Sequence, residues 1–306
     1  MPLKDSLESL STETKGLVLG FIGVFCFSLT FPATRVAVRS LDPTFVGLGR
    51  SVVAGILAGF LLLITRQKLP SRDQIKSLLI VAAGVIVGFP LLSTWAMRRL
   101  PASHGAIIGG ILPLVTIVVA AIRAGERPSR GFWGASLLGS MAVVLFAFVS
   151  GAQEAHLADL SADLALLGAV LAAAVGYAEG GRLARTMGGW RVICWALVLT
   201  APLLAVPVLS ILWKEGGSAP AAAWVGFGYV SLVSQFLAFF VWYQGLAIGG
   251  VARISQIQLL QPFLTILASA ILLGETVTPA MIGFALWVIA TVAVGRRMPV
   301  TQRREE

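Results

Sequence analysis

Long apolar stretches separated by short polar segments dominate this chain. An α-helix needs about 20 residues to cross a hydrocarbon core of about 30 Å. Ten stretches approach that length, with boundaries near residues 16–38, 44–65, 75–96, 104–123, 131–150, 162–183, 191–213, 221–244, 254–273 and 280–295. The pattern therefore predicts an all-α integral membrane protein with ten transmembrane helices.

Composition supports this prediction and narrows the function. Hydrophobic residues make up 57% of the chain and charged residues 12%, whereas a soluble domain has about 25% charged residues. The short polar segments leave no room for a soluble catalytic or ligand-binding domain. With two histidines and two well-separated cysteines, the chain shows no metal or redox motif. We therefore expect no catalytic residue, no metal, no cofactor and no enzymatic activity.

The basic residues predict an orientation in the membrane. The formal net charge is +9, but the charges are scattered through short loops, which argues against nucleic acid as a partner. An even number of spans places both termini on one side. With that side cytoplasmic, 17 of the 23 Lys and Arg residues fall in cytoplasmic segments and four fall outside, namely Arg39, Arg98, Arg99 and Lys214. This bias follows the positive-inside rule and predicts cytoplasmic termini.

The chain contains an internal repeat. Residues 111–126 align with residues 260–275 at a constant offset of 149. The matched pairs are Pro113 with Pro262, Thr116 with Thr265, Gly125 with Gly274 and Glu126 with Glu275. We infer two five-helix halves, 1–155 and 156–306. Because five is odd, the second half enters the membrane from the opposite side. Such an inverted repeat predicts two related conformations that open to opposite faces.

These repeated segments, together with the run Phe31-Pro32-Ala33-Thr34-Arg35, resemble the EamA-type drug/metabolite transporters over essentially the whole chain. Within that superfamily the sequence is similar to bacterial amino-acid exporters of the YddG type. The resemblance implies a ten-helix secondary transporter of the bacterial inner (plasma) membrane that exports amino acids or similar small metabolites by alternating access. An exporter of drugs or lipophilic cations is the alternative, and it would more naturally present buried carboxylates.

A polar stripe in the ninth apolar stretch is the best signal for a substrate cavity. Ser255, Gln258 and Gln261 share one helical face that is too polar for lipid. The residues expected to line a central cavity are Thr30, Thr34, Trp95, His104, Tyr177, Glu179, Tyr243, Gln258 and Gln261. Uncharged hydrogen-bonding groups with aromatic walls suit a zwitterion. The alternative for the stripe is hydrogen bonding between helices without a substrate.

Several charged or titratable groups admit two interpretations. Glu179 is the only carboxylate well inside a predicted span: it either faces the cavity or pairs with Arg182 at a helix end. His104 either titrates near neutral pH or is structural. Arg35 and Arg50 are expected at the outer mouth of the first hairpin, where a guanidinium could bind a carboxylate or anchor a helix end.

Prolines and glycines predict where helices bend and approach one another. Pro32, Pro113 and Pro262 lie within apolar stretches, so each is expected to act as a hinge or a static kink. The spacing G-x-x-x-G, as in Gly16/Gly20 and Gly245/Gly249, predicts close helix packing. The expected partners are a small-molecule substrate and the lipid bilayer. No soluble interface indicates an oligomer, so a monomer fits the sequence.

Overall fold

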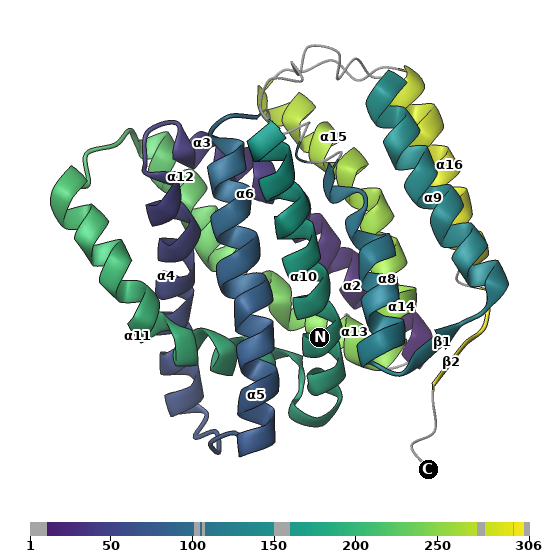
Figure 1. Ribbon diagram of the computed structural model, residues 1–306, viewed down its shortest axis with the longest axis horizontal. Coiled ribbons are helices and arrows are strands. Elements are labelled where there is room, and N and C mark those ends of the chain that lie inside the picture. Colours follow the sequence, from purple (N-terminus) through teal and green to yellow (C-terminus); the bar gives the residue numbers. More distant parts are fainter. Residues whose placement is uncertain are drawn as a thin grey trace, which may run out of the picture.

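The computed structural model describes residues 11–100, 105, 108–149, 160–273, 279–295 and 297–302. These residues form a helical bundle with one small antiparallel pair of strands at one end (Figure 1). The elements are α2 (Thr12–Ser28), α3 (Thr30–Val38), α4 (Pro43–Ile64), α5 (Arg72–Val81), η1 (Ala82–Gly88), α6 (Phe89–Met97), α8 (Leu112–Arg123), β1 (Glu126–Pro128), α9 (Arg130–Val149), α10 (Leu160–Met187), α11 (Gly189–Glu215), α12 (Ala221–Gly228), η3 (Tyr229–Leu237), α13 (Ala238–Gly249), α14 (Val251–Ser255), η4 (Gln256–Leu260), α15 (Gln261–Leu273), α16 (Pro279–Gly295) and β2 (Val300–Gln302).

Helical structure lies within each of the ten apolar stretches. Six helical stretches are long and apolar enough to cross a membrane: Thr12–Val38, Pro43–Ile64, Arg72–Met97, Leu160–Met187, Gly189–Glu215 and Ala221–Gly249. Shorter apolar helices cover Leu112–Arg123, Arg130–Leu145 and Ile282–Gly295. The mostly helical, membrane-spanning fold is thus confirmed, while the count of ten spans and the side of the termini stay predictions.

Local sequence signals set the helix starts. Ser11 caps α2 by accepting a 3.2 Å hydrogen bond from the Thr14 backbone nitrogen. Asp42 caps α4, which has Pro43 in its first turn, and Ser71 begins a capping box at α5. These residues satisfy backbone donors that a helix leaves unpaired at its N-terminus. They therefore fix where each helix leaves the polar loop before it.

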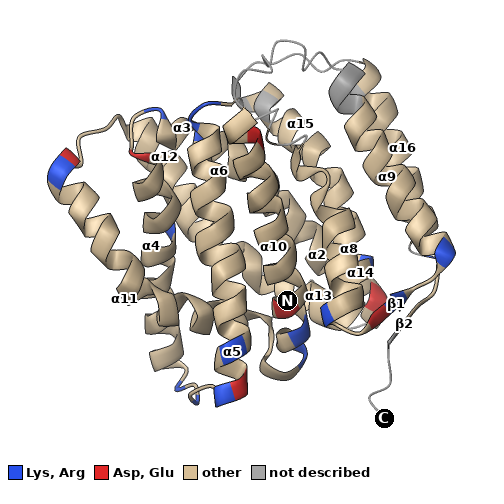
Figure 2. Ribbon diagram, in the orientation of Figure 1, with Lys and Arg blue, Asp and Glu red and all other residues tan. Residues whose placement is uncertain are grey.

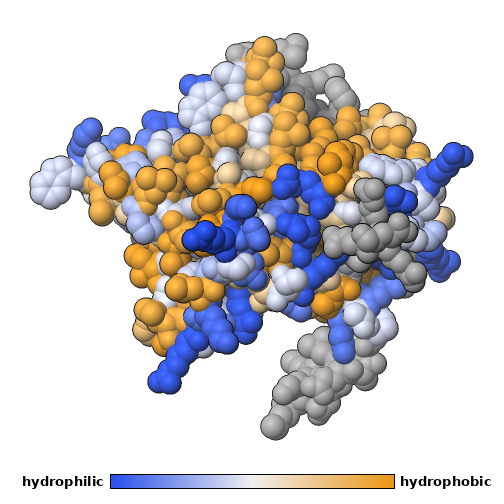
Figure 3. Space-filling view, turned by 60° about the horizontal axis from the view of Figure 1, so that its bottom comes forward, coloured by the Kyte–Doolittle hydropathy of each residue, from blue (hydrophilic) through white to orange (hydrophobic). Residues whose placement is uncertain are grey.

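The surface has the polarity of a membrane protein. Charged residues gather toward the two ends of the bundle, and the helix surfaces between them are largely uncharged (Figure 2). Large apolar side chains are exposed on the outer surfaces of the helices, including Leu63, Leu203, Val225 and Ile271. One end holds the start of α2, the α4–α5 turn, β1 and β2; we call it the Glu126 end. Viewed toward this end, hydrophilic surface is gathered over the helix ends and hydrophobic surface surrounds it (Figure 3).

The two halves of the chain pack across each other through glycines. Helix α2 of the first half lies against α13 of the second, where a Cβ added to Gly16 would meet the Gly249 Cα at 2.8 Å. Reciprocally, α10 of the second half lies against η1 of the first, where a Cβ on Gly84 would meet the Gly176 Cα at 2.9 Å. The G-x-x-x-G pairs thus mark close helix contacts, as the sequence predicts.

The halves also run in opposite directions. Helix α8 ends beside β1 at the Glu126 end, whereas α15, which contains the segment repeated from α8, extends to the other end of the bundle (Figure 1). Helices α9 and α16 lie together along one edge (Figure 1). This arrangement is the one that an inverted repeat of two five-helix units produces.

Two π-helical segments occupy equivalent places in the halves. Segments η1 and η3 begin at Ala82 and Tyr229, so their starts are 147 residues apart. A π-helix widens the turn and redirects backbone carbonyls, and it is frequent at functional sites. Side chains from neighbouring helices satisfy two carbonyls of η1: Gln235 donates to Val85 at 3.1 Å and Ser51 donates to Ile86 at 2.9 Å. Hydropathy patterns did not predict these segments.

Candidate substrate cavity

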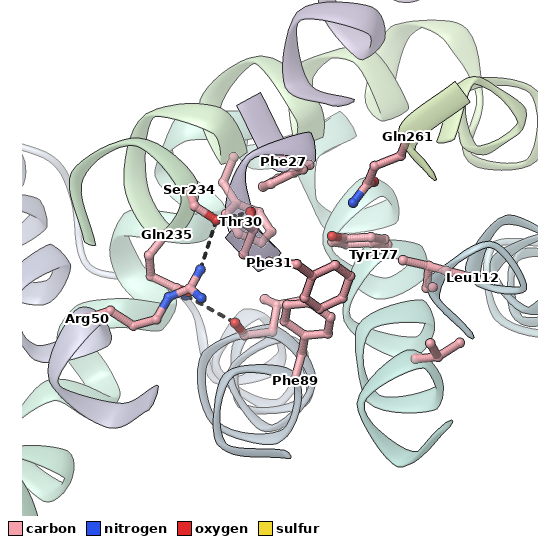
Figure 4. Close-up of a pocket in the computed structure, with 14 residues that line it drawn as sticks. Phe27, Thr30, Phe31, Arg50, Phe89, Leu112, Tyr177, Ser234, Gln235 and Gln261 are labelled. Carbon is pink, nitrogen blue, oxygen red and sulfur yellow. Dashed lines mark hydrogen bonds between the residues drawn. The ribbon is translucent and has the colours of Figure 1, made fainter. Parts of the chain in front are cut away.

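A small cavity lies inside the bundle, between the two halves (Figure 4). Its lining residues come from both halves: Phe27, Thr30, Phe31, Arg50, Val85, Phe89, Gly109, Leu112, Val170, Tyr177, Ser234, Gln235, Phe239 and Gln261. Both π-helical segments contribute, through Val85 and through the Ser234–Gln235 pair. In this conformation the cavity has room for little more than one ordered water molecule. A larger guest therefore requires the helices around it to separate.

Aromatic rings form one wall of this cavity. The Phe27 and Tyr177 rings stack with centroids 6.2 Å apart, and Phe27 meets Phe239 edge-on at 5.1 Å. The ring centroids of Phe31 and Phe89 lie 6.2 Å apart, and Figure 4 shows both rings on the Tyr177 side of the cavity, away from Arg50. Such rings offer a large apolar surface whose faces also attract cations. This wall suits an apolar or aromatic group on a bound molecule.

Hydrogen-bonding groups form the opposite wall. Ser234 Oγ accepts a 2.9 Å hydrogen bond from Arg50 Nη2 and lies 2.8 Å from Thr30 Oγ1. Arg50 is only 1% exposed. Within the described part of the chain, its Nε and Nη1 have no hydrogen-bond partner, and neither does Gln235 Oε1. The cavity thus combines a buried cation with an unpaired amide oxygen.

Three of the predicted cavity residues line it: Thr30, Tyr177 and Gln261. Two more are buried close to them in sequence. Thr34 lies one turn after Thr30 in α3, and Gln258 lies in the 3-10 segment η4 just before Gln261. A 3-10 helix has three residues per turn, so Gln258 and Gln261 share one face, as the polar stripe requires. The Thr34 hydroxyl and both polar atoms of Gln258 have no partner among the described residues.

Tyr243 and Trp95 lie outside the cavity lining. Tyr243 is fully buried behind α10, and its hydroxyl donates to the Gly176 carbonyl at 3.1 Å. Trp95 is 37% exposed, and the Arg99 guanidinium lies 4.0 Å from its ring centroid. His104 falls outside the described residues.

Glu179 lies away from this cavity, in a cluster of ion pairs. Its carboxylate accepts from Arg123 Nε at 3.1 Å and from Arg182 Nη2 at 2.5 Å. Arg182 also donates to Ser77 at 3.0 Å. The pair with Arg182 is the i,i+3 ion pair that was one of the two interpretations of Glu179 from the sequence. The carboxylate therefore joins α8 and α10 at the Glu126 end.

The three prolines lie at discontinuities of their helices. Pro32 follows a break at Leu29, which separates α2 from α3. Pro113 lies in the first turn of α8, and Pro262 is the second residue of α15, directly after the 3-10 segment. The absence of a proline N–H at each site is compatible with the broken hydrogen-bond ladder. Whether these sites act as hinges stays a prediction.

Glu126 is a second buried carboxylate, and the sequence predicted only its place in the repeat. It is 1% exposed and accepts hydrogen bonds from the backbone nitrogens of Val251 at 2.8 Å and Ala252 at 2.7 Å. Arg185 donates to it at 2.7 Å. Gly250, with φ of +85°, turns the chain so that α14 begins at the carboxylate. A carboxylate stabilises a helix N-terminus by accepting from its unpaired backbone N–H groups and by interacting with the helix dipole. Because Glu126 follows α8 directly, this contact joins the end of α8 to the start of α14.

Arg50 is the main cavity residue whose role the sequence did not place. Arg50 was expected at the mouth of the first hairpin, but α4 already begins at Pro43. Arg50 therefore lies about two turns inside the helix, where neighbouring helices cover it. The signal that could have found it was an arginine within an apolar stretch, because such residues face protein or a cavity rather than lipid.

A duplicated helical bundle with a cavity between its halves is typical of membrane transporters. Comparison with known families agrees with this class. The sequence profile of the "EamA-like transporter family" matches residues 14–148 and again residues 160–295. The chain therefore belongs to the EamA-like transporter family and carries two copies of its domain.

Individual relatives extend over nearly the whole chain. A Bacillus subtilis (strain 168) protein described as "Uncharacterized transporter YdeK" is 42% identical over 94% of this chain and 99% of its own length. The "Probable terminal-alkyne amino-acid exporter" of Streptantibioticus cattleyicolor is 25% identical, over 92% of this chain and 93% of its own. The "Protein PecM" of Dickeya dadantii is 23% identical, over 90% of this chain and 91% of its own.

A solved crystal structure has the same fold. It superposes with a TM-score of 0.76 over 93% of this chain and 99% of its own, at 18% sequence identity. At that identity the similarity extends to the fold alone.

Proposed function

We propose that this protein is a secondary transporter of the bacterial inner membrane that exports amino acids or similar small metabolites by alternating access. The observation that carries the proposal is the cavity between two oppositely directed halves, which is lined by aromatic rings and by polar groups that include unpaired ones. Small-molecule sites are mostly apolar with a few placed polar groups. The relative described as a probable amino-acid exporter supports the same substrate class.

The alternating movement is proposed to involve the two halves, 1–155 and 156–306, in a ten-span arrangement with both termini in the cytoplasm. In the described conformation, the contact of Glu126 with α14 and the contact of Glu179 with Arg123 join the two halves at the Glu126 end. Opening this end requires those contacts to break. Pro32, Pro113 and Pro262 are proposed as the positions where helices bend as this occurs.

A lipophilic-cation exporter fits the cavity less well. Such a substrate would call for a carboxylate in the cavity, and none of the described lining residues is Asp or Glu. Glu179, the candidate for that role, is held by two arginines. Thr30, Tyr177 and Gln261 are proposed to contact substrate, with Thr34 and Gln258 next to them.

Counterflow in proteoliposomes tests the proposal. A panel of amino acids, sugars and quaternary amines at two pH values should show saturable exchange of amino acids. Val170→Phe, which fills the cavity wall, should abolish exchange. Leu171→Phe is the matched control, because Leu171 is the next residue of α10 and is half exposed on the outer surface. Exchange of quaternary amines alone, or equal exchange by both variants, would contradict the proposal.

Labelling of introduced cysteines tests the inverted arrangement. Single cysteines beside Glu126 and Glu275, in a chain lacking Cys26 and Cys194, should react with impermeant maleimide from opposite faces of the membrane. Reaction of both from the same face would contradict the proposed topology.

A further inference from the structure

Arg50 is a buried charge that the protein itself leaves incompletely paired. It is one of the largest fully buried side chains, and its guanidinium donates a 2.9 Å hydrogen bond to Ser234 Oγ. A charged side chain inside a membrane is costly and is normally paired. In the part of the chain that the structure describes, Nε and Nη1 have no partner. The guanidinium therefore retains donors for a group that is not part of the protein.

The direction of the guanidinium places those donors at the cavity. Figure 4 shows the Arg50 side chain extending from α4 toward Ser234 and Gln235, on the side opposite Tyr177 and Gln261. Ser234 is in turn joined to Thr30 at 2.8 Å. These contacts restrict where the guanidinium can lie. It is thus held at one side of the cavity before any substrate arrives, which lowers the entropic cost of binding.

The chemistry of the site favours a carboxylate. Arg offers a planar set of donors that matches the two oxygens of a carboxylate, and its charge is compensated by an anion. The unpaired Gln235 Oε1 beside it is an acceptor, suited to an ammonium or another N–H donor. Phe27, Phe31 and Phe89 add an apolar wall at the other side.

We infer that Arg50 binds the carboxylate of the substrate, and that the substrate is an amino acid with an uncharged apolar or aromatic side chain. This inference rests on the proposed transport function and specifies its substrate. The α-carboxylate pairs with Arg50, the α-ammonium lies near Gln235 Oε1, and the side chain packs on the aromatic rings. Since the cavity in this conformation holds little more than a water molecule, the substrate enters when the helices separate, and it then satisfies donors that are otherwise unpaired.

Wild-type protein gives the first test, which needs no variant to fold. Counterflow is measured with phenylalanine and with phenylalaninamide, which keeps the ammonium and the ring but lacks the carboxylate. We expect the protein to exchange phenylalanine. Its apparent affinity for phenylalaninamide should be lower by at least about 30-fold. Equal exchange of both would overturn the inference and leave the transport function intact. No exchange of any amino acid would contradict the proposed function itself.

Variants of Arg50 give the second test. Arg50→Gln should weaken phenylalanine exchange by about 30-fold or more and change exchange of the amide much less. Arg50→Lys keeps the charge and should recover part of the affinity for the acid. Arg39→Gln is the matched control, because Arg39 is exposed at the end of α3. If Arg50→Gln lowered exchange of acid and amide equally, the role of Arg50 would be structural and the inference would be wrong.

Discussion

The Glu126 carboxylate lies 2.8 Å from the backbone nitrogen of Val251, a residue 125 positions further along the chain. The contact joins the end of α8 in the first half to the start of α14 in the second. Because Glu126 is buried and charged, each of its backbone hydrogen bonds is expected to be stronger than a neutral one, at about 1.5–3 kcal/mol. Loss of this contact is therefore expected to favour opening of this end.

Glu126→Gln should therefore open the Glu126 end more often. A loss of about 2 kcal/mol raises the open population about 30-fold. The measurement is the rate of maleimide labelling of a cysteine at Ala184, which is buried on α10 beside Arg185. Glu13→Gln is the control, since the Glu13 side chain in the Glu13–Arg253 pair is 46% exposed and the pair should contribute little. Equal labelling rates in the two variants would contradict this role.

Thr265 is expected to stabilise the break in the first helical stretch. Its hydroxyl donates a 2.7 Å hydrogen bond to the Ser28 carbonyl. In a regular α-helix this carbonyl would accept from the backbone N–H of residue 32, but Pro32 has no N–H. Thr265→Val should lower the free energy of unfolding by about 1 kcal/mol, and Thr265→Ser should lower it much less. Thermal unfolding in detergent measures both.

Pro32→Ala gives a second, coupled prediction at this break. Alanine at position 32 supplies a backbone N–H that can reach the Ser28 carbonyl. In the Pro32→Ala protein, Thr265→Val should therefore lower the free energy of unfolding by less than it does in the wild type. A straighter, continuous helix should also slow transport if the break is a hinge. Full wild-type flux with Pro32→Ala would contradict the hinge interpretation.

The glycine contact between α2 and α13 leaves no space for a side chain. A Cβ at Gly245 would lie 2.9 Å from the Gly20 backbone nitrogen, so Gly245→Ala should force the helices apart and destabilise the fold by about 1–3 kcal/mol. Gly134→Ala in α9 is the control, because nothing lies within 4 Å of its added Cβ. Thermal unfolding should show a loss only for Gly245→Ala; similar midpoints would show that the packing is loose.

Glu179→Gln should affect stability rather than the pH dependence of transport. Its carboxylate is shared by Arg123 and Arg182, and both guanidinium groups would lose their anionic partner. We expect a loss of about 1–3 kcal/mol, below the cost of a fully buried pair because both arginines are partly exposed. Asp73→Asn, in an exposed pair with Lys76, should have little effect. A changed flux–pH profile for Glu179→Gln would instead indicate proton exchange at this site.

Apolar length predicted the helices well and their internal irregularities poorly. The stretch expected at 44–65 is α4, Pro43–Ile64, and the one expected at 191–213 is α11, Gly189–Glu215. A discontinuity at Pro32 was predicted, and the break lies at Leu29, three residues before it. The π-helical segment from Ala82 was not predicted. A discontinuity or one extra residue in a turn changes hydrogen bonding without changing the hydropathy of the stretch.

The cavity was predicted only in part because its residues come from distant segments. Thr30, Tyr177 and Gln261 were recognised as polar or aromatic groups within apolar stretches. Arg50 was expected nearer the surface, since hydropathy does not give the depth of a residue in a bundle. The contact of Glu126 with α14 could not be inferred, because a single sequence does not show which loop meets which helix.

The interlocked glycine contacts of α2 with α13 and of α10 with η1 also bear on how the protein can be divided. Each half supplies a helix whose glycine surface is complementary to the other half and unsuited to contact with lipid chains. A gene split between the two repeats should therefore yield fragments that accumulate only when they are co-expressed, as the subunits of an obligate heterodimer do.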